Sequence, residues 1–183
     1  ELTGDSVRVL PEHLRYDGKP FHEWVEVLRT EIKTERIVEA INVMTIFGAR
    51  GYEKEAAAEI AGILRGAPQT HALRASMEFS QVMSASAVAF HLLGPAAIPE
   101  LVAMLNSKAP HETIIALELL SPPTEDPWNW PDSLPQPTTD GMTIGRSYEH
   151  SGVVNGTTLG KGNAELATVL KSLLKHPNAE IRA

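Results

Sequence analysis

Residues 93–101 read Leu-Gly-Pro-Ala-Ala-Ile-Pro-Glu-Leu, and this stretch decides the fold because it ends one helix and begins another. Gly94 stands where helices commonly end, and Pro95 suits the first turn of the helix that follows. Apolar residues then recur at three- and four-residue steps as far as Leu105, which is the period of an amphipathic helix. The stretch therefore predicts two helices joined by a tight corner.

The same helical period runs through residues 20–121 and returns at 164–174. Pro20 stands where a helix should begin, and Gly48 and Gly66 stand where helices should end. No comparable run of alternating residues precedes residue 140, so we expect an all-α protein over this range. Ten residues are expected to be buried: Trp24, Leu28, Ile41, Phe47, Ile60, Leu64, Phe90, Leu101, Leu105 and Leu170.

The helices also repeat along the chain. Leu28, Leu64 and Leu105 close successive helices at intervals of 36 and 41 residues, which suit a repeated helix pair. The next closing leucine, Leu174, follows after 69 residues, or one repeat plus an insertion. We expect antiparallel pairs in a right-handed stack, whose concave side is formed by the second helices at 35–47, 73–93 and 111–120.

Four segments follow from this pattern: an N-terminal extension (1–19), helical repeats (20–121), an irregular insertion (122–163) and the start of a further repeat that is truncated (164–183). The insertion holds six of the 13 prolines and six of the 13 glycines, and proline interrupts helices. Asn155-Gly156 between β-prone residues predicts a short hairpin turn. The chain opens at Glu1 without a basic-then-apolar leader, so we expect that any leader has been removed, and both a cytoplasmic and an extracytoplasmic location fit the sequence.

Three segments resemble the HEAT-repeat family, in the form common in planctomycete bacteria: 93–101, with its Gly-Pro entry and second proline; 16–24, continuing through 47–52; and 177–183, a turn followed by Ile-Arg. The resemblance implies an α-solenoid of stacked helix pairs that binds other macromolecules, mostly without catalytic activity. The chain departs from the family in its long helix at about 72–93, in Thr113 where arginine is usual, and in the insertion.

Composition excludes several functional classes. The net charge of −7 argues against nonspecific binding to nucleic acid or to an anionic membrane, because both need clustered Lys and Arg. No window approaches the roughly 18 uninterrupted apolar residues of a membrane span. Cysteine is absent, which excludes disulfides, thiolate metal sites and a cysteine nucleophile.

Two His-Glu pairs, His22-Glu23 and His111-Glu112, invite comparison with HEAT-like deoxyhypusine hydroxylases, whose repeated His-Glu pairs bind a di-iron centre. Here there are only two pairs, at non-equivalent repeat positions, so we expect no metal or cofactor. Both histidines are expected at the surface of helix starts, too far apart to share an ion. His91 is expected to be half-buried and hydrogen-bonded.

Two further motifs are rejected as catalytic or phosphate sites. Ser84-Ala85-Ser86 lies within a helical run with no strand before it, so it does not form a nucleophile elbow. The glycines at 156, 160 and 162 lack the spacing and the strand-to-helix context of a phosphate-binding loop. No catalytic residue is therefore predicted.

Trp128 and Trp130 are the strongest candidates for a binding site. They stand in the proline-framed sequence Pro127-Trp128-Asn129-Trp130-Pro131, and rigid aromatics in loops are typical interface anchors. The alternative is that they fold back onto the helical core. We expect 122–163 to be ordered, with one tryptophan packed on neighbouring helices.

These observations favour a non-catalytic helical-repeat scaffold that mediates protein–protein interaction through its concave face and insertion loop. The partner is a protein of unknown identity. The alternative is a HEAT-like enzyme with a metal or cofactor in the groove, related to the di-iron hydroxylases or to the bilin lyases with HEAT-like repeats.

Overall fold

The computed structural model describes residues 13–66, 77–121, 138–139, 142–143, 159–160 and 162–182. This part of the chain is mostly helical, as the sequence predicts. The α-helices are α1 (Phe21–Thr30), α2 (Thr34–Phe47), α3 (Glu53–Arg65), α5 (Met77–Leu93), α6 (Ile98–Leu105), α7 (Pro110–Leu120), α8 (Ala164–Leu173) and α9 (Ala179–Arg182).

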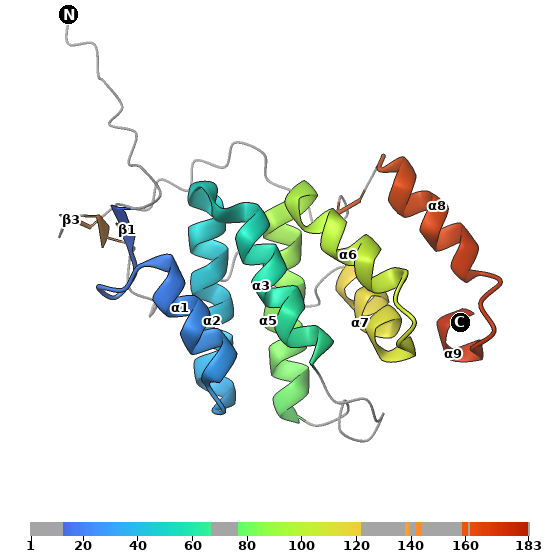
Figure 1. The fold of residues 1–183 in the computed structure, drawn as a ribbon, viewed down its shortest axis with the longest axis horizontal. Helices are drawn as coiled ribbons and strands as arrows, with labels where there is room; N and C mark the ends of the chain where they lie inside the picture. The colour runs from blue at the N-terminus through green and yellow to red at the C-terminus, as the bar shows by residue number, and fades with distance from the viewer. Residues whose placement is uncertain are drawn as a thin grey trace, which may run out of the picture.

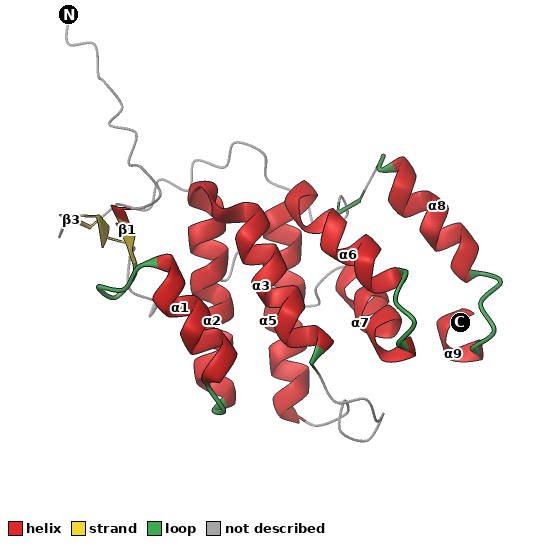
Figure 2. Ribbon diagram, in the orientation of Figure 1, coloured by secondary structure: helices red, strands yellow, loops and turns green. Residues whose placement is uncertain are grey.

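The described helices lie in two rows (Figures 1 and 2). One row contains α1, α3, α6 and α8, and the other contains α2, α5, α7 and α9; each helix contacts the next in its row. Helices α1, α3, α6 and α8 run in the same direction, and α2, α5 and α7 run in the opposite direction (Figure 1). Sequence neighbours such as α1 and α2 therefore pair antiparallel, as expected.

The core lies between the two rows. Nine of the ten residues expected to be buried are buried, and Leu170 is only partly buried. The expectation that Leu174 closes α8 is wrong, because Leu174 is 69% exposed whereas its neighbour Leu173 is 8% exposed. The insertion before α8 changes the spacing from Leu105, so only burial shows that Leu173 is the last buried leucine of α8, as Leu28, Leu64 and Leu105 are of α1, α3 and α6.

Two corners join consecutive helix pairs without a long loop. Between α2 and α3 lies the π-helical turn η2 (Gly48–Tyr52), in which Gly51 has a φ of 108°. Between α5 and α6 lies the 3₁₀-helix η3 (Gly94–Ala97), which begins at Gly94 with a φ of 58°. Both positive φ values favour glycine. A Cβ on Gly48 would clash with the Leu93 side chain, so this glycine also lets the two corners pack together.

Three aromatic rings fill the space beside the first corner. Phe21 of α1 stacks on Tyr52 of η2 with their ring centroids 4.4 Å apart. Phe47 at the end of α2 meets both rings edge-on, at 5.5 Å from Phe21 and 5.9 Å from Tyr52. Edge-to-face and offset-stacked aromatic pairs add to the energy of burial. These contacts pack the η2 corner against the start of α1.

Residues 13–20, the described part of the N-terminal extension expected at 1–19, pack against the first helix pair. Tyr16 and Lys19 exchange backbone hydrogen bonds of 2.9 and 3.0 Å across a turn in which Asp17 and Gly18 have φ values of 49° and 72°. The Trp24 indole Nε1–H donates to the Tyr16 carbonyl at 2.9 Å, and both side chains are fully buried. The turn therefore covers the first helix pair.

A small sheet lies next to this turn, although only helices were expected before residue 140. Strand β1 (Leu14–Arg15) pairs antiparallel with β2 (Thr138–Thr139), which pairs with β3 (Met142–Thr143). The sheet thus connects the N-terminal end of the rows with part of the insertion. Such pairing joins positions more than 120 residues apart, so no local pattern predicts it.

Two ion pairs connect neighbouring helices of the first row. Arg29 of α1 forms a bidentate pair with Glu59 of α3, at 3.0 Å from Nε and 2.8 Å from Nη2. Arg65 of α3 donates to Glu100 of α6 at 2.6 Å. Both arginines directly follow a closing leucine, and both glutamates stand five residues before the next one. The two pairs therefore occupy equivalent positions, and we call them rungs.

The last helix pair is held differently. Asn163 caps α8 by accepting a 2.9 Å hydrogen bond from the Leu166 amide. Gly160 has a φ of 76°, and a Cβ on it would clash with Leu166. Arg182 of α9 donates to the carbonyls of His176 and Pro177 at 2.6 and 2.9 Å, which ties the second helix to its own turn. Among the described residues, no ion pair bridges α6 and α8.

One helical stretch in the described chain, Glu78–Leu105, is long and apolar enough to cross a membrane by length and composition alone. It comprises α5, η3 and α6, which bend at Gly94, and 61% of its most apolar window is buried inside the protein. The core helices of a packed protein have this property as well.

Candidate interaction surface

Helices α2, α5 and α7 correspond to the three second helices expected at 35–47, 73–93 and 111–120. Their outward side is the candidate surface. Helix α5 contacts α2 and α7 on its two flanks and α3 behind it. The least buried residues of α5 therefore lie on its fourth side, which faces away from the first row. This line runs at helical spacing through Gln81, Ser84, Ala85, Val88 and Leu92. We call the outward side of these three helices the second-row face.

The exposed line of α5, at the centre of the second-row face, is uncharged. Between Glu78 and Glu100 the chain has no Asp, Glu, Lys or Arg. On the flanking helices the partly exposed positions include Val38 and Asn42 of α2 and Ile114 and Leu117 of α7. The exposed line of α5 therefore offers aliphatic and small polar groups, whereas α2 carries the partly exposed ion pair of Arg36 and Glu39 and α7 carries the exposed Glu118. Depletion of charge, as on α5, is one mark of the core of a protein interface.

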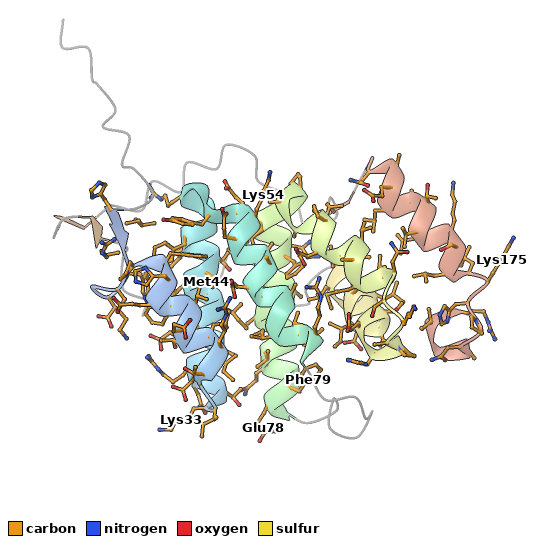
Figure 3. All side chains as sticks on the ribbon, viewed as in Figure 1. Lys33, Met44, Lys54, Glu78, Phe79 and Lys175 are labelled. Atoms are coloured by element: carbon orange, nitrogen blue, oxygen red, sulfur yellow. The ribbon has the colours of Figure 1, made fainter. Side chains whose placement is uncertain are left out.

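Charges gather instead at the edge where first helices turn into second helices. Glu35, Glu78 and Glu112 stand in the first turns of α2, α5 and α7, where carboxylates favour the positive end of the helix dipole. Lys33 and Lys108 precede two of them and are exposed. Figure 3 shows Lys33 and Glu78 at this edge. The edge is mixed in sign and has no strong net charge.

The Glu31 carboxylate organises part of this edge. Its Oε1 accepts hydrogen bonds from the backbone N–H groups of Lys33 and Ile32, at 3.1 and 2.9 Å. These bonds favour the ionised form and lower the pKa of Glu31. The turn presents Ile32, whose side chain is 90% exposed.

His22 and His111 differ in their surroundings, and one expectation about them is corrected. His22 on α1 is exposed, as predicted. His111 on α7 was expected at the surface but is only 8% exposed, because the first turn of α7 packs its inner side against the core. No hydrogen-bond partner for His111 Nε2 is found among the described residues.

His91 joins the C-terminal ends of α5 and α7. It is 2% exposed, and its Nε2 donates to the Ser121 carbonyl at 3.2 Å. Burial lowers the pKa of the His91 imidazole, and the carbonyl groups of Ser121 and Leu119 oppose this effect. The His91 side chain therefore links the C-terminal end of α5 to Ser121, the residue that precedes the insertion.

The serine motif rejected as a nucleophile elbow lies within a helix, as expected. Ser84 and Ser86 lie in the middle of α5, and the Ser86 hydroxyl is fully buried. In the part of the chain that the structure describes, no group of three or more His, Asp or Glu lies close enough to hold a metal ion. Trp128, Trp130 and the predicted turn at Asn155-Gly156 lie outside the described residues, so they stay predictions.

Sequence reasoning missed the two rungs and the pairing of β1 with β2. The rungs have a signal that could have revealed them: Glu59 and Glu100 precede a closing leucine by five residues, and Arg29 and Arg65 follow one directly.

Comparison with known proteins finds no matching family model, no match among curated proteins and no match among solved structures.

Proposed function

We propose that this protein is a non-catalytic helical-repeat scaffold of the HEAT-like type, which binds a protein partner through its second-row face. The observation that carries the proposal is the repetition of the Arg–Glu rung at equivalent positions of successive first helices. Equivalent side chains make equivalent contacts only when neighbouring units stack in the same way, which is the defining property of a solenoid.

The second-row face supports a binding role. In stacked helix pairs the second helices present a continuous surface on which a partner can contact several units at once. Here the exposed line of α5 is uncharged, and the edge of the surface is mixed in charge. Trp128 and Trp130 in the insertion would add anchors if they reach the same partner.

The alternative proposal is a HEAT-like hydroxylase or bilin lyase with a metal or cofactor in the groove. Metal analysis of the purified protein separates the two proposals, because a di-iron enzyme would carry iron in stoichiometric amount. We expect none. Stoichiometric iron would favour the enzyme and would direct attention to His22 and His111.

The binding role is tested by site-specific photo-crosslinking in the organism that makes the protein. A photoreactive amino acid replaces Val88 on the second-row face, and in a matched variant it replaces Ala103, an exposed residue of α6 in the first row. We expect one discrete protein adduct from position 88 and none from position 103. Adducts from position 103 alone, or from neither position, would contradict the proposal.

A further inference from the structure

The exposed charged side chains on the helices of the second-row face are all acidic. Helices α5 and α7 contain no Lys or Arg, and α2 contains only Arg36. The guanidinium of Arg36 pairs with Glu39 and lies 5.8 Å from the ring centroid of the buried Trp24, so this cation is already engaged. The exposed charged residues of α2, α5 and α7 are Glu35, Glu78 and Glu118.

The exposed charges on the first-row helices are mixed in sign. Helices α1 and α3 expose Glu23, Glu53 and Glu55, while α3 and α8 expose Lys54 and Lys171. The lysines of the turns that lead into α2 and α7 stand outside those two helices. Exposed charge of a single sign is therefore found on the helices of the second-row face and not on those of the first row.

The acidic side chains stand near both ends of the uncharged line of α5. Glu78 lies in the first turn of this helix, at the N-terminal end of the line (Figure 3). At the other end, the hydrogen bond between His91 and Ser121 fixes the register of α5 against α7, which runs in the same direction (Figure 1). Glu118 comes three residues before Ser121 and is therefore level with Val88 of α5.

The spacing of these acids determines what a partner must carry. Val88 lies about 15 Å beyond Glu78 along the helix axis, and neighbouring helices are about 8–10 Å apart. Glu78 and Glu118 therefore leave their helices about 17–18 Å from each other. A matching helical segment has Lys or Arg side chains about 12 residues apart, with apolar side chains between them for the line of α5.

We infer that the second-row face binds a basic amphipathic segment of a partner protein. Its apolar side chains lie on the line of α5, and its Lys or Arg side chains lie beside Glu78, Glu118 and Glu35. Opposite charges on the two sides favour this class of partner and disfavour an acidic segment. The inference rests on the proposed function, because it names the chemistry of the partner for the same face.

The inference is tested by photo-crosslinking in the organism, with the photoreactive amino acid at position 88. The variant E35Q/E78Q/E118Q removes the three exposed carboxylates from the second-row face. The matched variant E23Q/E53Q/E55Q removes three exposed carboxylates from α1 and α3, so the net charge of the chain changes equally in both. Circular dichroism shows whether the two variants keep the same helical content.

We expect at least about threefold less adduct from E35Q/E78Q/E118Q and an unchanged amount from E23Q/E53Q/E55Q, because each exposed ion pair contributes modestly to binding. Mass spectrometry of the adduct formed without these substitutions should identify a segment with Lys or Arg on both sides of an apolar stretch. If E35Q/E78Q/E118Q loses helical content, the identity of this segment decides the question.

Two results would overturn the inference while the proposed function stands. One is an equal amount of adduct from the two folded variants, and the other is a crosslinked segment without flanking Lys or Arg. The absence of any adduct from position 88 would instead contradict the proposed function, and this inference with it.

Discussion

The first three helix pairs and the last pair differ in how they are joined, although all present the same kind of apolar side to the core. Helices α1 to α7 are linked by two helical corners and two Arg–Glu rungs, whereas α8–α9 follow a 42-residue insertion and dock through Leu166, Leu173 and Ile181. Burial alone brings helices together. Among the described residues, the short helical corners and the Arg–Glu rungs are found only between the first three pairs.

The largest effect is expected from Trp24→Ala. Trp24 is fully buried, donates a hydrogen bond to Tyr16 and lies under the cations of Lys19 and Arg36, at 5.0 and 5.8 Å from its ring centroid. Its truncation should cost about 3–5 kcal/mol in the free energy of unfolding, because it leaves a cavity. Urea denaturation followed by circular dichroism measures the cost, with His22→Ala on the same helix as a control expected within about 0.5 kcal/mol.

The matching substitution in the last helix pair is Leu173→Ala. It should reduce the hydrogen-exchange protection of α8 while the protection of α3 stays nearly unchanged, because α8 lies at the end of its row and packs mainly against α6, whereas α3 packs against helices on several sides. If Leu173→Ala lowers the protection of α3 as strongly as Trp24→Ala does, the two regions unfold as one and the contrast between them is wrong.

Gly48→Ala should have the next largest effect. The new Cβ would clash with the buried Leu93 side chain where two corners meet, so overpacking should cost about 1–3 kcal/mol. The matched control is Gly62→Ala on the exposed side of α3, which has nothing within 4 Å of the new Cβ and should stabilise the helix by about 0.5–1 kcal/mol. If Gly48→Ala leaves the free energy of unfolding unchanged, the η2 and η3 corners can shift enough to make room for the new Cβ.

The rungs should have a smaller effect. A double-mutant cycle with Arg65→Ala and Glu100→Ala should give a coupling energy of about 0.2–1 kcal/mol, because the pair is partly exposed to water. The same cycle at Asn106 and Thr168, the equivalent positions of α6 and α8, should give a coupling near zero. Equal coupling energies at the two positions would show that the rung does not distinguish the α3–α6 contact from the α6–α8 contact.

The smallest effect concerns pH. Because burial lowers the pKa of His91 below its ordinary value of 6.5, the unfolded chain binds a proton more readily than the folded protein does. The contribution of His91 to stability is therefore complete above pH 6.5 and is lost as the pH falls from 6.5 through the lower folded-state pKa. Denaturation at pH 7.5 and pH 5.5 should show a smaller loss in His91→Gln than in the natural protein. An equal loss in both would assign the pH dependence to other groups.

The sequence by itself determined the helices, their boundaries and most of the core. Pro20, Gly48 and Gly94 act within a few residues of the chain, and the 3.6-residue period of apolar side chains marks the buried side of each helix. The expectation that the helices at 35–47, 73–93 and 111–120 form a concave side came instead from the resemblance to stacked helix pairs, and it stays a prediction.

Only the tertiary structure decided the contacts between distant residues. The burial of His111, the choice of Leu173 over Leu174, the pairing of β1 with β2 and the two rungs each depend on which neighbour packs against a side chain. A helical period repeats every few residues and so carries its own signal, whereas a contact between distant segments depends on how whole helices stack. That stacking is set by the sum of many small packing energies, which no short stretch of sequence contains.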